Sequence, residues 1–299
     1  MPELDPSARR LAPARSARLR QAGSCAATGG TLIAGAIWQR EAGMSDRVRG
    51  WSLAWSEDFD GDAGSPADPR IWRMETGGGG WGNEELQYYT DGSENAFLDG
   101  GGNLAIVVRQ PEPRLRDGRY SGCAYTSARL ISKDRVALRY GLVQARIQVP
   151  DGRGIWPAFW MLGQDIDNAG WPQCGEIDVM EILGQDPAVV HGTVHGPGYS
   201  GDAGVTASHR ASTSLAAGFH VYSIAWEPSS IHWYLDDQLY AAVAPGDLRG
   251  RPWVFDHSFY LLINVAVGGT FPGNPDSAMI FPRTMLIDYI RHYTTPAPD

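Results

Sequence analysis

Three carboxylates, those of Glu176, Asp178 and Glu181, lie close together in the segment GEIDVME. Apolar residues separate them, which is typical of a β-strand. A core strand does not bury three charges, because an unpaired ionised carboxylate is costly to desolvate. The three acids are therefore expected on a wet or functional face of a sheet. A calcium site or simple solvation is the alternative to catalysis.

The spacing of the three acids does not fit a regular strand. Glu176 and Asp178 are two positions apart and share a face, whereas Glu181 is five positions from Glu176 and would face the opposite side. One extra residue at Val179-Met180, a β-bulge, would turn Glu181 back to the face of the other two. We predict this bulge.

Two carboxyl groups on one face suit hydrolysis of a glycosidic bond with retention of configuration. The strand separates the backbones of Glu176 and Glu181 by roughly 13 Å, which leaning side chains can shorten to the ~5–5.5 Å that this mechanism needs. One carboxyl must be ionised and the other protonated, and close like charges push the two pKa values apart. Glu176 is assigned as the nucleophile, Glu181 as the acid/base and Asp178 as the residue that orients the nucleophile.

Tryptophans flank the acidic segment. Trp156 and Trp160 are four positions apart in GIWPAFWML, so both point to one face of a strand, and Trp171 precedes the acids. An indole offers a flat apolar plate for a sugar ring and an N–H for a hydroxyl. Tryptophan on a β face is more often part of a core, but the neighbouring acids favour sugar binding here.

Alternating polar and apolar residues predict strands through most of the chain after residue 51. The alternation is clear over 143–149, 231–235 and 286–293, and an Asp236-Asp237 turn before the apolar 239–243 predicts a hairpin. No amphipathic helix competes. A single all-β domain of two packed antiparallel sheets is therefore predicted.

The 299 residues are 43% hydrophobic and carry a formal net charge of −9. Arginine is in excess over residues 1–50, so the remainder is more acidic still and disfavours nucleic acid as a partner. A neutral polysaccharide is not repelled. No stretch is long and apolar enough to span a bilayer, and a monomer is expected.

Residues 1–46 are interpreted as an extension, and the catalytic domain is predicted over 47–299. The extension begins basic and becomes mildly apolar over 25–38, like a secretory signal without a clean cleavage site. A signal would make the protein secreted or part of the cell envelope, whereas a start at Met44 is the alternative. Of three cysteines, Cys25, Cys123 and Cys174, the last two either form a disulfide or remain thiols.

The acidic and tryptophan segments, taken with GWGNEELQYY at 80–89, resemble glycoside hydrolase family sixteen, most of all its laminarinase branch. Further similarity lies in YTSARL at 125–130, GTVH at 192–195 and LINVAVGG at 262–269. The resemblance covers roughly residues 51–295. The bulged E-x-D-x-x-E spacing is typical of laminarinases, agarases and carrageenases.

The resemblance implies a β-jelly-roll sandwich of the concanavalin A type, with an open cleft on one sheet for internal cleavage of a long chain. The chemistry needs no cofactor. For His195, a core histidine with satisfied hydrogen bonds is the alternative to a cleft residue. Trp171 is expected to bind sugar because it lies near the acids, and the positions that match sugar-binding residues of the cleft are Asn83, Glu85, Arg129, Trp156, Trp160 and His195.

The resemblance also implies a structural calcium ion on the convex side, for which Glu57, the backbone at Gly101 and Asp288 match the ligand pattern. Oxygen ligands suit calcium, but a surface salt bridge would explain the two acids equally well.

Two residues depart from the family pattern. Phe271 stands where tryptophan is usual, and His257 replaces a glutamine, so both concern substrate preference rather than catalysis.

The expected function is endo-β-1,3-glucanase activity on laminarin-like polymers. The alternatives are the same mechanism on mixed-linkage glucan or galactan, transglycosylation through the same covalent intermediate, and β-glucan binding without hydrolysis. Binding proteins of this kind typically lack the two catalytic glutamates, which this chain retains.

Overall fold

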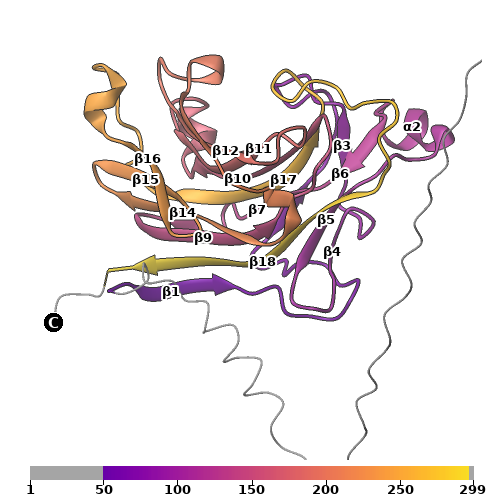
Figure 1. Cartoon of the computed structure of the whole chain (residues 1–299), viewed down its shortest axis with the longest axis horizontal. Coiled ribbons are helices and arrows are strands. Elements are labelled where there is room, and N and C mark those ends of the chain that lie inside the picture. The colour runs from indigo at the N-terminus through magenta and orange to yellow at the C-terminus, as the bar shows by residue number, and fades with distance from the viewer. Residues whose placement is uncertain (1–49, 296–299) are drawn as a thin grey trace, which may run out of the picture. The chain divides into compact units, whose positions relative to one another are not determined.

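The computed structural model describes residues 50–295, which form two antiparallel sheets of eight strands each (Figure 1). Sheet A has the order β16-β15-β14-β9-β18-β5-β4, and β1 also pairs with β18. Its strands are β1 (Ser52–Glu57), β4 (Ala96–Leu98), β5 (Leu104–Val108), β9 (Gly141–Gln148), β14 (His220–Glu227), β15 (Ser230–Leu235), β16 (Gln238–Val243) and β18 (Arg283–Thr294).

Sheet B has the order β13-β12-β11-β10-β17-β7-β2, and β8 also pairs with β17. Its strands are β2 (Arg73–Glu75), β7 (Arg129–Ile131), β8 (Ala137–Leu138), β10 (Ile155–Gly163), β11 (Glu176–Ile182), β12 (Val189–His195), β13 (Val205–Arg210) and β17 (Phe259–Val267).

The remaining elements are short. Strands β3 (Gln87–Tyr89) and β6 (Tyr125–Ser127) pair in parallel and form a separate two-stranded sheet. The helices are α2 (Pro113–Arg119), α3 (Ile166–Ala169) and the 3-10 turns η2 (Gly201–Ala203), η3 (Leu215–Ala217) and η4 (Pro245–Leu248).

The main core lies between the two sheets, as the alternation predicts. On β9, the buried Val143, Ala145 and Ile147 belong to it. Strand β17 is buried along its whole length. The pair β3–β6 contacts it, since the Ser127 hydroxyl donates to the carbonyl of Val265 at 2.7 Å. The outer face of β17 is thus partly covered, while the sandwich interior covers the other face.

The predicted hairpin is confirmed. Strands β15 and β16 pair with each other and are joined at Asp236 and Asp237, whose φ angles are 45° and 71°. Two successive residues with positive φ form the type of turn whose twist matches that of an antiparallel hairpin. Asp tolerates this conformation better than most residues. The alternating segments at 143–149 and 286–293 likewise form β9 and β18.

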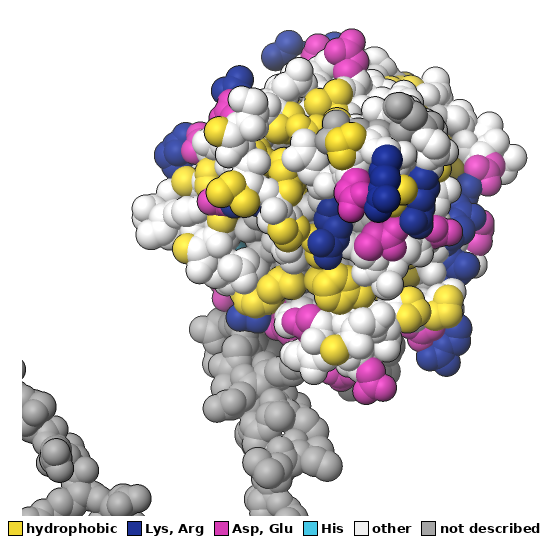
Figure 2. Space-filling model, turned by 90° about the vertical axis from the view of Figure 1, so that its right-hand side faces the viewer, with side chains coloured by type: hydrophobic (Ala, Val, Ile, Leu, Met, Phe, Trp, Pro, Cys, Tyr) yellow, Lys and Arg dark blue, Asp and Glu magenta, His cyan; other side chains and the backbone are white. Residues whose placement is uncertain are grey.

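Charges are interspersed on the face of the molecule in Figure 2, where basic side chains lie beside acidic ones. Ion pairs such as Arg70–Asp68 and Arg210–Asp186, both at 2.6 Å, show the same pattern. The basic side chains on this face therefore form no purely basic patch for a phosphate backbone. Among the described residues, no helix combines the length and apolarity that crossing a membrane requires.

The predicted extension at 1–46 lies outside the described residues, so the boundary of the catalytic domain at residue 47 stays a prediction.

Cys123 and Cys174 are both free thiols. Cys174 is completely buried, and burial raises the pKa of its thiol to about 11. Of the two alternatives for these cysteines, the structure therefore favours thiols over a disulfide.

Candidate active site

Strand β11 carries the predicted bulge. Against β10, Trp160 pairs with Asp178 and the adjacent Phe159 pairs with Met180, which leaves Val179 as the extra residue. Against β12, the register shifts over the same stretch. The bulge at Val179-Met180 is confirmed.

The bulge sets which side chains of β11 face the core. The side chains that belong to the core are those of Ile177, Val179, Met180 and Ile182. Glu176, Asp178 and Glu181 therefore point away from it, onto the outer face of sheet B. In a regular strand, Glu181 would instead enter the core between the sheets.

Indole N–H groups hold the two glutamates. Trp171 Nε1 donates to Glu176 Oε2 at 2.6 Å, and Trp156 Nε1 donates to Glu181 Oε1 at 3.1 Å. Trp171 is 48% exposed, so its ring offers a free surface as well as a donor. Both tryptophans lie beside the acids as predicted.

Asp178 is the most buried of the three acids and is 3% exposed. Its Oδ2 lies 3.2 Å from His195 Nε2, and its backbone carbonyl accepts a hydrogen bond from Trp233 Nε1 at 2.8 Å. His195 pairs in register with Glu176 across β11 and β12, and its ring lies 6.3 Å from the Trp171 ring. The structure thus places His195 beside the acids and not in the core between the sheets.

Burial raises the pKa of all three carboxyl groups. For Glu176 the pKa rises to about 8, because of desolvation first and the negative charge of Asp178 second. Desolvation raises the pKa of Asp178 to about 7. The pKa of Glu181 is raised well above its ordinary value by desolvation and then by the charges of Asp178 and Glu176. Near neutral pH the site therefore retains protons, and one glutamic acid remains available as a proton donor.

An aromatic cluster adjoins Glu181 on the β12 side. His191 pairs in register with Glu181, and its Nδ1 lies 2.8 Å from the hydroxyl of Ser208. Phe271 makes edge-to-face contacts with His191 and Trp156, at centroid distances of 5.4 and 5.5 Å. Phe271, a departure from the family pattern, therefore forms part of the wall next to this acid.

Asn83 and Glu85 adjoin the segment that leads to Phe271, since the Thr270 N–H donates to the carbonyl of Asn83 at 2.9 Å. Asn83 Nδ2 donates to Glu85 Oε1 at 3.0 Å, while Gln87 Nε2 and the Tyr89 hydroxyl donate to Glu85 Oε2 at 2.5 and 3.3 Å. Burial raises the pKa of Glu85, and these hydrogen bonds oppose the rise. Asn83 and Glu85, predicted as sugar ligands, therefore already bind each other.

Arg129 lies between two indoles. Its guanidinium carbon is 4.9 Å from the ring centre of Trp81 and 4.8 Å from that of Trp160. Its Nε also lies 2.7 Å from Glu75 Oε2. Trp160 pairs in register with Asp178, so the Arg129–Trp160 contact adjoins the three acids.

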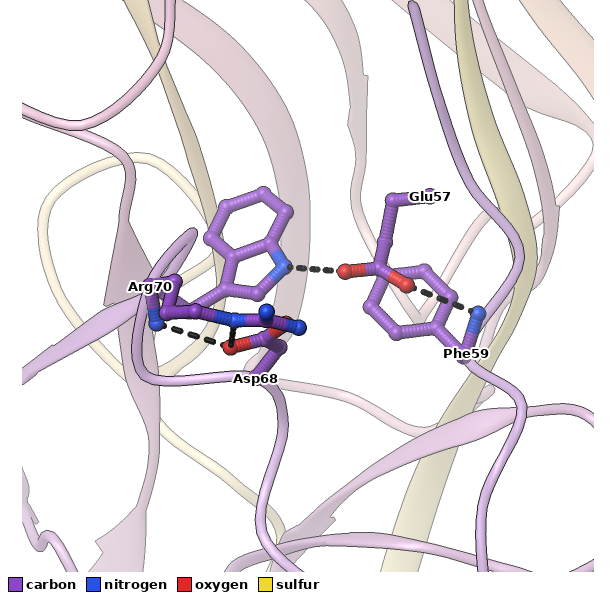
Figure 3. Close-up of polar contacts among 5 residues, drawn as sticks. Glu57, Phe59, Asp68 and Arg70 are labelled. Carbon is purple, nitrogen blue, oxygen red and sulfur yellow. Dashed lines mark hydrogen bonds and ion pairs between the residues drawn. The ribbon is translucent and has the colours of Figure 1, made fainter.

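The residues predicted to bind calcium belong to other parts of the fold. Glu57 ends β1 and accepts hydrogen bonds from the Phe59 N–H at 3.0 Å and from Trp72 Nε1 at 3.3 Å (Figure 3). Gly101 donates its N–H to Asp99 Oδ1 at 2.7 Å, in the loop that joins β4 and β5.

The fit of these residues to a calcium ion is uneven. Glu57 suits a cation, because its hydrogen-bond donors are uncharged and burial raises its pKa, with the charges of Asp68 and Asp58 adding to the rise. Asp288 suits one less well, since its Oδ2 already lies 2.6 Å from Arg146 Nη1. The calcium site stays a prediction.

One other group of side chains could hold a metal ion. Within residues 50–295, Glu176, Asp178 and His195 form the only set of three such residues whose ligand atoms all lie within 4.8 Å of one another. These are the residues of the candidate catalytic centre. Their proximity is explained by the pairing of β11 with β12.

Several residues of the site escaped the sequence analysis. Tyr89 and Asn264 lie behind Trp160, and His191 lies beside Glu181. A signal existed for Tyr89, since Glu85, Gln87 and Tyr89 alternate at the period of a strand. Asn264 lies in the LINVAVGG segment, but nothing in that segment or around His191 indicated a contact with the site.

A two-sheet sandwich with paired carboxyl groups on one outer face, held by indole donors, defines a carbohydrate-active enzyme. Residues 81–289 match the family model described as Glycosyl hydrolases family 16, and the chain belongs to this family. It is therefore a glycoside hydrolase, and the predicted β-jelly-roll sandwich is confirmed.

Similar proteins cover most of the described residues. The "Beta-glucanase" of Rhodothermus marinus is 42% identical over 263 residues, which span 83% of this chain and 87% of that protein. The laminarinase catalytic domain of Thermotoga maritima MSB8 has 45% identity and a TM-score of 0.75, covering 82% of this chain and 98% of that one. The endo-beta-1,3-glucanase of Pyrococcus furiosus has 42% identity and a TM-score of 0.76, covering 83% of this chain and 96% of that one.

Proposed function

We propose that this protein is a retaining endo-β-1,3-glucanase that cleaves internal bonds of laminarin-like glucans. The observation that carries the proposal is the bulge in β11, which brings Glu176, Asp178 and Glu181 onto one outer face. The relatives named as a β-glucanase, a laminarinase and an endo-β-1,3-glucanase support the choice of polymer.

In the proposed first step, Glu181 donates its proton to the oxygen of the scissile glycosidic bond. Its raised pKa keeps this proton in place until the leaving group needs it. Glu176 attacks the anomeric carbon as a carboxylate, and the bond to the leaving sugar breaks as the bond to Glu176 forms.

Asp178 and Trp171 prepare Glu176 for this attack. Carboxylate oxygens of Glu176 and Asp178 lie within 4.8 Å of each other and both groups have raised pKa values, so Asp178 can hold the proton that Glu176 must release. The Trp171 N–H, 2.6 Å from Glu176 Oε2, stabilises the ionised nucleophile.

In the second step, the Glu181 carboxylate removes a proton from water, and the water oxygen attacks the anomeric carbon and displaces Glu176. Two inversions give overall retention. If a sugar hydroxyl enters instead of water, the same step transfers the glycosyl group.

The test of the function is reducing-end release from laminarin. Wild type is expected to release oligosaccharides of several lengths, and Glu176→Gln is expected to lose at least ~10³-fold in kcat because no covalent intermediate forms. A panel with mixed-linkage glucan, agarose and carrageenan measures the polymer preference. Hydrolysis of a galactan alone would overturn the choice of substrate.

The roles of the two glutamates are tested separately by azide rescue. With an activated aryl glycoside and azide, Glu176→Ala is expected to give the α-glycosyl azide, because azide attacks directly in place of the missing nucleophile. Glu181→Ala is expected to give the β-azide, since azide then attacks the covalent intermediate. The reverse product pattern would exchange the two assignments.

The proposal extends to the place and state in which the protein acts. A polymer of glucose does not cross a bilayer, so we place the activity outside the cell or in its envelope; laminarinase activity confined to the cytoplasmic fraction would contradict this.

We also propose a monomer, because one chain supplies every residue assigned to the site. Light scattering of the purified protein tests that state.

A further inference from the structure

A chain of hydrogen bonds leads from Trp160 away from the acids. Trp160 Nε1 donates to Asn264 Oδ1 at 2.7 Å, and Asn264 Nδ2 donates to the Tyr89 hydroxyl at 3.0 Å. The Tyr89 hydroxyl donates to Glu85 Oε2 at 3.3 Å, and Gln87 Nε2 donates to the same oxygen at 2.5 Å. We call the first four residues, Trp160, Asn264, Tyr89 and Glu85, the indole relay.

The donors of the relay all point in one direction. An indole N–H can only donate, so Asn264 must turn its oxygen to Trp160 and its amide hydrogens to Tyr89. Tyr89 then donates onward, and the Glu85 carboxylate accepts at the end. Because each group has a fixed role, rotating Asn264 or Tyr89 breaks two hydrogen bonds of the relay.

The relay is buried. Tyr89 is 0% and Asn264 is 6% exposed, so water does not readily replace a lost partner. Gln87, also 0% exposed, joins the end of the relay to sheet B, because its Oε1 accepts from the Val267 N–H at 2.8 Å. The relay therefore connects strand β3 to the two central strands of sheet B, β10 and β17.

The face of Trp160 is fixed as well as its edge. The guanidinium carbon of Arg129 lies 4.8 Å from the centre of the Trp160 ring, and Arg129 is itself held by Trp81 and Glu75. The Arg129 cation over the ring and the Asn264 acceptor at its N–H both favour the observed orientation of the indole. Trp160 adjoins Asp178 in register, so this orientation sets where a stacked sugar meets the acids.

We propose that Tyr89 and Asn264 are positioning residues, which hold the Trp160 indole as a rigid plate for the sugar next to the scissile bond. The inference rests on the proposed function. It also changes the role of Glu85, which then acts as the acceptor that ends the relay, in place of a ligand for sugar hydroxyls. A rigid plate lowers the entropy lost on substrate binding and keeps the anomeric carbon near Glu176.

The experiment uses Tyr89→Phe in the full chain, which removes one hydroxyl and keeps the ring. Tyr222→Phe is the matched control, because the Tyr222 hydroxyl is also buried but has no hydrogen-bond partner among the described residues. Tyr89→Phe is expected to raise KM for laminarin about ten-fold with kcat changed less than about three-fold, while Tyr222→Phe leaves both unchanged. The pH limits of activity are expected to stay in place, because the three acids are untouched.

A second measurement does not depend on activity. The indole ¹⁵N–¹H resonance of Trp160, assigned by its absence in Trp160→Phe, reports the exchange of that proton with solvent. Tyr89→Phe is expected to accelerate this exchange about ten-fold relative to wild type and to Tyr222→Phe. Tyr89→Phe in the Trp160→Phe background is expected to raise KM less than two-fold further, because the relay no longer has an indole N–H to hold.

The outcomes separate the two proposals. If wild type does not cleave laminarin, the proposed function fails, and exchange of the Trp160 proton alone then decides whether the relay holds the ring. If wild type is active, an unchanged KM or an unchanged exchange rate in Tyr89→Phe overturns the positioning role. Additive effects of Tyr89→Phe and Trp160→Phe on KM also overturn it, because they would show that Tyr89 does not act through Trp160.

Discussion

At the scale of single residues, the site depends on keeping protons on carboxyl groups that would lose them in water. Desolvation is the largest cause of the raised pKa for each of Glu176, Asp178 and Glu181. The negative charge of Asp178 raises the pKa of both glutamates further, so replacing one acid alters the protonation of the others. This coupling can be measured.

Asp178→Asn is expected to move the acidic limit of kcat/KM to lower pH by about one unit. The negative charge of Asp178 raises the pKa of Glu176, so its removal lowers that pKa, and the nucleophile ionises at lower pH. The rate at the optimum is expected to fall, because Asp178 also orients Glu176. A pH profile of kcat/KM on laminarin provides the measurement, and a shift of the acidic limit to higher pH would contradict the assignment.

Glu176→Gln is expected to stabilise the protein at pH 8 more than at pH 5. The pKa of Glu176 is raised from 4.5 to about 8 on folding, so between these values the folded state retains a proton that the unfolded chain has lost. Wild-type stability therefore falls as pH rises through this window, whereas the amide has no such dependence. Calorimetry at both pH values is expected to show a higher Tm for Glu176→Gln, mainly at pH 8. Each kcal/mol gained in the free energy of unfolding raises Tm by about 2–4 °C.

At the scale of elements, the bulge in β11 decides whether a catalytic centre exists. It was predictable because the positions of the three acids conflict with strand parity, and only an extra residue reconciles them. The pairings that surround it were not predictable, because they join β11 to β10 and β12 through residue-by-residue registers that no local pattern encodes.

Deletion of Val179 is expected to abolish activity and to lower stability. The strand becomes regular, and Glu181 then turns toward the core, where an ionised carboxylate is costly. Val179→Ala is the control, since it retains the bulge and is expected to cost about 2 kcal/mol of stability while most of kcat remains. Thermal unfolding and laminarin hydrolysis measure the two effects, and an active deletion variant would show that the bulge is dispensable.

Calcium is expected to raise Tm through Glu57. Desolvation and the charges of Asp68 and Asp58 disfavour the ionised form of Glu57 and raise its pKa. A bound divalent cation would stabilise the ionised carboxylate and so offset both effects. Thermal unfolding with added calcium and with a chelator is the measurement, and Glu57→Gln is expected to remove the difference. The same Tm under both conditions in wild type would exclude this site and leave Asp288 to its ion pair with Arg146.

At the scale of the whole molecule, the alternation of residues in β9, β15 and β18 was enough to predict two packed sheets. The order of the strands was not, since neighbours such as β10 and β17 are far apart in the chain. The same limit applies to the site. Asn264 and Tyr89 are bonded across 175 positions, so only the fold reveals the indole relay.

A chain that starts at Met44 is expected to match the full chain in kcat and KM on laminarin. All residues assigned to chemistry or sugar binding lie between Asn83 and His195, within the described part of the chain. Parallel kinetics of both chains provide the measurement. A loss of activity on shortening would show that residues 1–43 contribute to the working enzyme.

The last strand of the described residues lies inside sheet A. Strand β18 pairs with β9 and β5, and β1 also joins it (Figure 1). During synthesis, β1 and β5 therefore emerge long before the segment that must join them, and the sheet cannot close until residue 294 has left the ribosome. The nascent chain must keep its apolar strands from aggregating until then, and a stop codon before residue 283 would leave β9 and β5 without the strand between them.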